Sequence, residues 1–512
     1  MSKRAAPRMA VIGFDSADPS LVEQWSDKGL LPAFARLRRQ GTWVNLQNRG
    51  EFPSTTIWPS IYTGAQPGKY GIYYIIQIAQ GAPKLELVGP ENCRQPPFWT
   101  HLGACGKSSI VLDVPFTYPV PGVRGLQICN WGSYERYAPA ASEPREALGE
   151  IERRFGRYPF GAELSRNAPI TDQDLRSVRR KLLDGVRVKG EAIRGLMSER
   201  DWDFFIAVFA ETHPAGHYFW GPDNSSSAPK LRAEFNSTLL DVYKSVDNEI
   251  GKIADSLDER TTLMLVSGHG MGANNAGWHL LPGVLGQMGL SHSEGGESRS
   301  RDGASQWLSR LRGSIPRRWR DFASRSLPHR IRDALRVHWA GSGIDWLKDR
   351  AFSLPADGHG FVRVNLKGRD SNGNVDAGPE YKEICGKISL TLKSLSHPQT
   401  GKPVVEEVFL TDEVFPGPER DKLPDLIVSW RDGGQIDAVT SKEIGTVSGK
   451  LPDSRRGNHR GEGFALLCGP GVAKGRKAEG HLLDIAPTVL SFYGAEPPGS
   501  MDGRSWTNLL GL

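Results

Sequence analysis

Short runs of Val, Ile, Leu and Phe recur along this chain of 512 residues, and longer stretches with helical periodicity separate them. Runs of this kind are typical of strands that are buried on both faces. Strands that alternate with helices predict an α/β fold, with a doubly wound, mostly parallel central sheet and helices on both of its faces. The clearest runs are Met9–Phe14, Ser109–Val114, Phe204–Phe209, Thr262–Val266, Phe361–Val364, Leu426–Trp430 and Phe464–Leu467.

Two of the intervening stretches have the features of long helices. Thr171 is followed three residues later by Asp174, which is the spacing of a capping box, and a helix is expected over Leu175–Met197. Another stretch, from about 233 to 257, has apolar residues at helical spacing. Helices of this length can cover one face of a central sheet.

Hard oxygens and imidazoles stand at the ends of several apolar runs. Four short segments lie at or just past the end of such a run, and a fifth precedes one. Ligands bind outside the carboxyl ends of the strands in doubly wound folds, so we expect these side chains to converge at one edge of the sheet and form a metal site. The five segments are Val11–Asp15, Phe52–Trp58, Glu211–His217, Val266–Gly270 and Gly457–His459.

Two of these segments also have an ordinary structural interpretation. Asp15 ends the first strand, where an isolated Asp is often a turn or cap residue, but Ser16 or Asp18 can fill that role and leave Asp15 to bind a metal. Three adjacent hydroxyl residues at 54–56 open a helix, which is a common position for N-caps. A hydroxyl in this place becomes a nucleophile when a metal lowers its pKa.

The residues that follow the hydroxyl cluster carry a family resemblance. Thr63-Gly64 and Pro67-Gly-Lys-Tyr-Gly-Ile72 resemble the alkaline phosphatase superfamily, in particular its branch of type I phosphodiesterases and nucleotide pyrophosphatases. Tyr70 stands where that branch usually has His. The branch has a Ser or Thr nucleophile about nine residues before its Thr-Gly, so the resemblance implies Ser54 as the nucleophile and Thr55 as the alternative.

The resemblance extends along nearly the whole chain. It includes a strand, a metal-ligand segment and a Phe-Trp pair within Trp202–Trp220, and several shorter segments in the second half of the chain. This many ordered segments imply the fold of the superfamily. The shorter segments are Val364–Arg369, Pro424–Val428, Asp484–Leu490 and Met501–Arg504.

The resemblance also implies two adjacent metal ions, usually zinc. In the family one ion is held by an Asp-x-x-x-His pair and a late His, and these positions become His213, His217 and His459. The other ion is held by the first Asp, the nucleophile and an Asp-His pair. These positions become Asp15, Ser54 and the pair Gly268-His269.

Two of these positions depart from the family pattern. His213 replaces a carboxylate, which leaves three imidazoles with an open fourth position, an arrangement suited to Zn²⁺. Gly268 has no ligand to offer, so the chain is expected to bind one or two zinc ions, with the second site open to question. The residues that could replace the missing ligand are Asn274, Asn275 and His279.

The function that the resemblance implies is metal-dependent hydrolysis of a phosphate ester, of the phosphodiester or nucleotide type, through a covalent intermediate on Ser54 or Thr55. The expected partner is a small anionic phosphate-ester substrate; sulfate and phosphonate esters stay open because a fold does not define a substrate. Two alternatives also stay open. One is a non-catalytic descendant that binds a metal or an anion, and the other is a phosphotransferase.

The bulk composition narrows the partners and the compartment. A net charge of +6 is small for this length and does not indicate a nucleic-acid-binding protein. The five cysteines are scattered without a Cys-x-x-Cys pair, which favours a reducing compartment. The first apolar run is too short for a signal peptide, and none approaches the roughly 20 residues of a membrane span, so a cytoplasmic protein is expected. The oligomeric state is not indicated.

One region interrupts the alternation of strands and helices. Residues 291–349 are rich in Arg, Ser and Gly, with aromatic and aliphatic residues between the arginines. We interpret them as a helical Arg-rich insertion or a lid, and residues 1–290 and 350–512 as the alkaline-phosphatase-like core.

Overall fold

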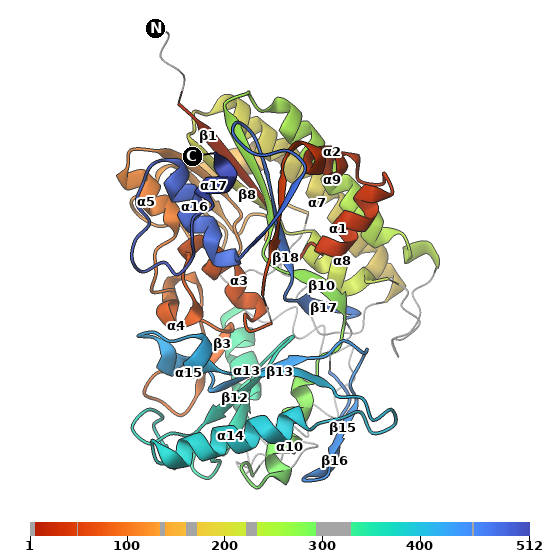
Figure 1. Ribbon diagram of the computed structural model, residues 1–512, viewed down its shortest axis with the longest axis vertical. Helices are drawn as coiled ribbons and strands as arrows, with labels where there is room; N and C mark the ends of the chain where they lie inside the picture. The colour runs from red at the N-terminus through yellow and green to blue at the C-terminus, as the bar shows by residue number, and fades with distance from the viewer. Residues whose placement is uncertain are drawn as a thin grey trace. The chain divides into compact units, whose positions relative to one another are not determined.

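The computed structural model describes residues 6–48, 50–133, 139–159, 171–221, 233–292, 329–452 and 455–511 (Figure 1). The chain divides into two compact units. Unit 1 comprises Met1–Tyr70, Gly89–Asn274 and Arg455–Leu512, and unit 2 comprises Gly71–Val88 and Asn275–Ser454. All of the expected catalytic and metal-binding residues belong to unit 1.

Unit 1 is built on a nine-stranded sheet with the strand order β19-β2-β18-β9-β1-β8-β5-β6-β7. Strand β1 lies in parallel between β8 and β9, while β18 runs antiparallel to both of its neighbours. The sheet is therefore mostly parallel at its centre, as the sequence predicts. Its strands are β1 (Arg8–Phe14), β2 (Thr42–Leu46), β5 (Ser108–Leu112), β6 (Arg124–Cys129), β7 (Ala141–Glu143), β8 (Phe204–Phe209), β9 (Thr261–Ser267), β18 (Gly463–Cys468) and β19 (Arg476–Gly480).

Helices cover both faces of this sheet (Figure 1). Alternate residues of β1, namely Ala10, Ile12 and Phe14, lie in a core shared with α1, α2, α7 and α9. Helices α3, α5 and α16, which contact one another, lie on the other side. The helices of unit 1 are α1 (Pro19–Asp27), α2 (Pro32–Gln40), α3 (Ser54–Thr63), α4 (Pro67–Tyr70), α5 (Phe98–Ala104), α6 (Ala147–Phe155), α7 (Asp172–Glu199), α8 (Thr212–Phe219), α9 (Thr238–Ser256), α16 (Ile485–Phe492) and α17 (Thr507–Leu510).

Both expected long helices are present. Helix α7 begins after Thr171, whose side chain accepts a hydrogen bond from the backbone of Asp174 while Asp174 returns one, so the capping box is confirmed. Helix α9 begins five residues later than expected, because a short 3₁₀ turn at Ala233–Phe235 precedes it.

Unit 2 contains a four-stranded antiparallel sheet with the order β11-β12-β14-β13. The expected strands at Phe361–Val364 and Leu426–Trp430 form β12 and β14 of this sheet, so their assignment to the mostly parallel sheet was wrong. An apolar run shows that a strand is buried and does not show which strand pairs with it. The elements of unit 2 are β3 (Ile76–Ile78), β4 (Leu85–Leu87), α10 (Leu281–Gln287), α13 (His329–Gly341), β11 (Ala351–Leu354), β12 (Gly360–Val364), α14 (Pro379–Lys393), β13 (Val405–Leu410), α15 (Thr411–Val414), β14 (Leu426–Trp430), β15 (Ala438–Ser441) and β16 (Gly445–Ser448).

Most of the expected Arg-rich insertion, residues 293–328, lies outside the described residues. The described helix α13 at its end belongs to unit 2. The boundaries of the insertion and its role as a lid stay predictions. Within the described ranges, none of the helices combines the length and the apolar character that a membrane span requires.

Strand β1 and helix α3 approach each other closely at the edge of the sheet where the expected site residues lie. Gly13 lies in β1 directly under the Trp58 ring of α3, and a Cβ at position 13 would overlap Cη2 of that ring and lie 3.0 Å from Val208 Cγ2. Trp58 is buried, and its indole N–H reaches back to the carboxylate of Asp15, 3.2 Å away. The absence of a side chain at Gly13 therefore lets α3 pack at the end of β1.

We expect Gly13→Ala to lower the free energy of unfolding by about 1–3 kcal/mol, because the added methyl group overpacks the contact with Trp58. Gly251→Ala on α9 is the matched control: its new Cβ would lie 3.4 Å from Ala33 Cβ, and alanine is favoured in a helix by roughly 1 kcal/mol. Urea denaturation of both variants measures the effect. Equal stability of the two would contradict the close packing of α3 on β1.

Candidate metal centre

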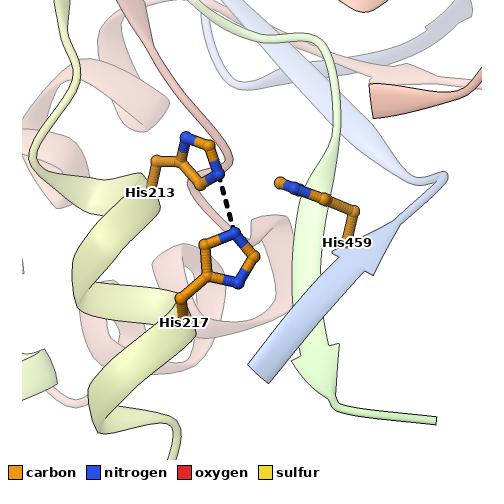
Figure 2. Close-up of side chains that lie close together, drawn as sticks. All are labelled: His213, His217 and His459. Carbon is orange, nitrogen blue, oxygen red and sulfur yellow. Dashed lines mark hydrogen bonds between the residues drawn. The ribbon is translucent and has the colours of Figure 1, made fainter. Parts of the chain in front are cut away.

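Three histidines from two elements form a cluster (Figure 2). His213 and His217 lie one turn apart on α8, and His459 belongs to β17 (Gly457–Arg460). The Nε2 atoms of His213 and His217 are 2.8 Å apart, and the ring centroid of His459 lies 4.9 Å from each of theirs. Each ring offers one nitrogen, and these three nitrogens lie within 4.8 Å of one another. The structure thus brings together the three residues expected at the first metal site.

Glycines allow the elements that carry the histidines to approach closely. Strand β17 pairs antiparallel with β10 (Gly270–Ala273), with His459 opposite Met271. A Cβ at Gly457 would overlap the carbonyl oxygen of Gly216 on α8, and a Cβ at Gly216 would lie 2.7 Å from Met271 Cγ. Helix α8 and the paired strands β10 and β17 therefore approach each other closely, which brings His459 beside the histidine pair of α8.

The Nδ1 atoms of the two α8 histidines face oxygen acceptors. His213 Nδ1 lies 3.0 Å from Asp15 Oδ2, and His217 Nδ1 lies 2.8 Å from the carbonyl oxygen of Gly457. A carboxylate and a carbonyl only accept, so each Nδ1 carries a proton, and the two Nε2 atoms share one further proton across their 2.8 Å hydrogen bond. An ion that replaced this proton would receive the lone pairs of both Nε2 atoms. Metal-binding histidines in proteins are commonly held in this way, with the second ring nitrogen donating to a carboxylate or a backbone carbonyl.

The protonation states of His217 and Asp15 are those that metal-binding residues need. Burial, and then the nearby charges of Arg455 and His213, hold the pKa of His217 well below its usual 6.5, so this imidazole is neutral at neutral pH. Burial works against the charged form of Asp15, but the neighbouring His213, the hydrogen bond with it, His269 and Trp58 outweigh burial and lower the pKa of Asp15. The centre therefore combines neutral imidazole with one carboxylate. Such nitrogen donors with an open fourth position fit a divalent ion such as Zn²⁺.

Ser16 and Asp18 have different roles from each other. Asp18 caps α1 by accepting a hydrogen bond from the backbone of Leu21, as expected for one of the two. Ser16 is fully buried, and its hydroxyl lies 2.9 Å from His269 Nε2 and 3.3 Å from His459 Nδ1. Its backbone has a φ of 61°, in the left-handed region that non-glycine residues rarely adopt. A strained residue with its hydroxyl between two imidazoles was not predicted from the sequence.

The expected nucleophiles lie at the start of α3. Ser54 is the first residue of this helix and Thr55 the second, and both are half-buried. The Thr56 hydroxyl donates to the carbonyl oxygen of Pro53 over 2.7 Å, and the N-cap position of α3 is Pro53, without a side-chain cap, so none of the three hydroxyls caps this helix. Trp58, one turn after Ser54, donates to Asp15 Oδ1 and anchors the first turn of α3 to the end of β1. The roles of Ser54 and Thr55 stay predictions.

Tyr70, which replaces the usual His of the family, supports the same helix. It is fully buried, and burial raises its pKa well above the usual value. Its hydroxyl lies 2.8 Å from Ser60 Oγ and donates to the carbonyl oxygen of Thr56 over 3.2 Å. Tyr70 thus holds two turns of α3 in place.

Position 268 has no room for a ligand. Gly268 lies between β9 and β10, and a Cβ there would overlap Ile57 Cγ2 and lie 2.7 Å from Ile61 Cδ1. Both isoleucines are buried residues of α3. The space that the family gives to a carboxylate is therefore filled by apolar side chains, so this position does not fit the second metal site of the family.

The residues that could have replaced the missing ligand have other partners. Asn274 donates to the carbonyl oxygen of Arg455 over 3.0 Å. Asn275 and His279 belong to unit 2, where they contact the carbonyl oxygens of Trp430 at 2.9 Å and Gly449 at 3.1 Å. These contacts give no support to a replacement ligand.

Comparison with known proteins agrees with the fold. A family model described as type I phosphodiesterase / nucleotide pyrophosphatase matches residues 9–450. The matched range includes Asp15, Ser54, His213 and His217 and ends before His459. A search of the curated proteins found no match.

Solved structures share the fold at low sequence identity. Wild-type alkaline phosphatase PafA matches with a TM-score of 0.55 and 15% identity, over 99% of this chain and 100% of that chain. Inactive murine ectonucleotide pyrophosphatase/phosphodiesterase 5 in complex with AMP matches with a TM-score of 0.50 and 12% identity, over 99% of both chains. Phosphonoacetate hydrolase from Sinorhizobium meliloti 1021 with phosphonoformate matches with a TM-score of 0.50 and 14% identity, over 95% of both chains.

We expect His217→Ala to weaken the binding of Zn²⁺ by more than about 100-fold, since the loss of a direct ligand exceeds the 10–100-fold effect of an outer hydrogen-bond partner. Competition with a chromogenic chelator measures the affinity. His101→Ala on α5 is the control and should bind as the wild type does. Equal zinc affinity of the His217 variant and the wild type would show that the ion binds elsewhere.

Proposed function

The chain belongs to the type I phosphodiesterase/nucleotide pyrophosphatase family, and on that premise we propose that it hydrolyses phosphate esters of the phosphodiester or nucleotide type at a metal centre. The observation that supports this proposal is the cluster of His213, His217 and His459 at the end of the central sheet. Zn²⁺ is the ion that three imidazoles and an open position suit best. When bound, such an ion supplies a Lewis acid for a phosphoryl oxygen.

Ser54 is the nucleophile in this proposal. Its place at the start of the ten-residue helix α3 puts it where backbone N–H groups and the helix dipole favour a phosphoryl anion. The Ser54 oxygen bonds to phosphorus as the bond to the leaving oxygen breaks, and the hydroxyl proton ends on the leaving alcohol. Water then cleaves the phosphoester on Ser54 and restores the hydroxyl. Thr55 is the alternative nucleophile.

The surrounding residues hold the centre in position. Asp15 accepts from His213 and from Trp58, so it links α8 and α3 to the end of β1. The low pKa of His217 keeps its ring neutral, as a ligand must be. These groups position the reacting phosphate relative to Ser54.

The substrate is proposed to be a small anionic phosphate ester. The similar structures name AMP and phosphonoformate as their ligands, so nucleotides, phosphodiesters and phosphonates form the panel to test. A cytoplasmic location is also proposed, because all five cysteines are free thiols.

A non-catalytic protein that binds a metal or an anion is the second candidate. The filled space at Gly268 favours it, because a catalytic ligand of the family is missing there. A phosphotransferase, in which an alcohol replaces water in the second step, uses the same nucleophile. The three proposals differ in turnover and in product.

We expect Ser54→Ala to lower the turnover of bis(p-nitrophenyl) phosphate or a dinucleotide on the order of 10³-fold or more, because the covalent step is lost, while the zinc content stays unchanged. Thr55→Ala is the matched control and should retain most of the activity. The reverse result would make Thr55 the nucleophile.

The same assays separate the alternatives. Turnover by neither the wild type nor any variant, over the whole panel and with zinc bound, would support the non-catalytic protein. Transfer of phosphate to added glycerol in preference to water would identify a phosphotransferase.

A further inference from the structure

The groups that the family would use for a second metal ion make other contacts here. Asp15 accepts a hydrogen bond at each carboxylate oxygen, 3.0 Å from His213 Nδ1 and 3.2 Å from Trp58 Nε1. His269 Nε2 faces the Ser16 hydroxyl at 2.9 Å. The place of the missing carboxylate at Gly268 is filled by Ile57 and Ile61.

The Ser16 hydroxyl has one proton to donate and two lone pairs with which to accept. When His459 binds an ion through Nε2, its Nδ1 carries a proton and donates to the Ser16 oxygen, 3.3 Å away. His269 Nε2, 2.9 Å from the same oxygen, then either accepts the Ser16 proton or donates to the second lone pair of Ser16. In both cases Nε2 of His269 has no lone pair left for a metal. The arrangement that orients His459 for one ion therefore removes His269 from the ligands of a second.

The conformation of Ser16 supports a specific role for its hydroxyl. A φ of 61° strains the backbone of a serine, whereas glycine adopts it readily. The fully buried hydroxyl is held at both of its contacts by imidazoles of the centre. His269 is in turn positioned by Ser267, whose hydroxyl lies 2.9 Å from the His269 carbonyl oxygen and 3.1 Å from that of Phe14.

Electrostatics also oppose a second ion. Metal ions in two-metal sites lie about 3.5–4 Å apart and repel each other, so anionic ligands are needed to hold both. Among the residues that the family resemblance assigns to the two sites, Asp15 is the one carboxylate, because His213 and Gly268 replace the others.

We propose that the protein binds a single divalent ion at His213, His217 and His459, and that Asp15 and the Ser16–His269 pair, in place of a second ion, orient the ligands of the first. Asp15 is the positioning residue for His213, and Ser16 is the positioning residue for His459, with His269 behind it. This inference rests on the metal centre of the proposed function and deepens it. The hydrolysis then requires one ion. The backbone N–H groups at the start of α3 stabilise the negative charge beside Ser54, which a second ion stabilises in the two-metal sites of the family.

The test is a titration of the metal-free protein with Co²⁺, followed by its visible absorption, together with elemental analysis of the zinc-loaded protein. We expect saturation at one equivalent in the wild type. Ser16→Gly should keep one equivalent but bind about 10–100-fold more weakly, because His459 loses its hydrogen-bond partner. The melting temperature of the metal-free variant should not fall, because glycine relieves the backbone strain.

The variants separate a positioning role from a merely structural one. Ser16→Ala keeps the strained backbone and loses the hydroxyl, so it should show the same weaker binding as Ser16→Gly. His269→Ala should also keep one equivalent and weaken its binding. Unchanged affinity in all three variants would overturn the positioning role.

Stoichiometry separates this inference from the proposed function. Two equivalents in the wild type, with the second lost in His269→Ala, would overturn the single-ion centre and leave the hydrolase proposal standing. No bound ion in the wild type at any concentration of zinc or cobalt would overturn the metal centre itself, and with it both proposals.

Discussion

The hydrogen bond between the carboxylate of Asp15 and the imidazole of His213 connects the fold to the site. Asp15 follows β1, the middle strand of the nine-stranded sheet, and His213 lies in the first turn of α8. The other oxygen of the same carboxylate accepts from Trp58 of α3. The buried carboxylate of Asp15 thus aligns two helices that begin at the same edge of the sheet. Burial opposes its charge, but the neighbouring rings of His213, His269 and Trp58 lower its pKa and keep it ionised.

The packing of helix α3 against the sheet affects the site in two ways. Its Trp58 ring lies over Gly13, which brings the helix close enough to bond Asp15. On the same helix, Ile57, which directly precedes Trp58, and Ile61, one turn later, lie against Gly268 and fill the position at which the family has a carboxylate. The packing that holds Ser54 at the start of the helix therefore also removes the room for a ligand of the second ion. The hydroxyl of Ser16 and the imidazole of His269, which follows Gly268, form a hydrogen bond with each other instead.

Much of the fold and part of the site could be predicted from the sequence. The strands at Met9–Phe14 and Phe204–Phe209 were recognisable because parallel strands buried on both faces leave continuous apolar runs. The family resemblance assigned His213, His217 and His459 to one metal site, and the structure places the first two on α8. The second compact unit was not predicted, since apolar runs such as Leu426–Trp430 carry no information about their pairing partners.

The remaining features of the site depend on contacts between distant segments. The Ser16 hydroxyl contacts residues 253 and 443 positions away in the sequence, so its role has no local signature. The side chains that fill the space beside Gly268 belong to Ile57 and Ile61 of α3, more than two hundred residues earlier in the sequence. A resemblance shows which ligand is missing; only the packing shows that Ile57 and Ile61 fill its place.

The most direct test of the account is a crystal structure of the zinc-loaded protein with anomalous diffraction recorded on both sides of the zinc absorption edge. The account predicts one anomalous peak, within about 2.1 Å of a nitrogen of each of His213, His217 and His459. The hydroxyl of Ser16 should still lie between His459 and His269. A second peak between Asp15 and His269, or a peak that none of the three histidines of the cluster contacts, would contradict it.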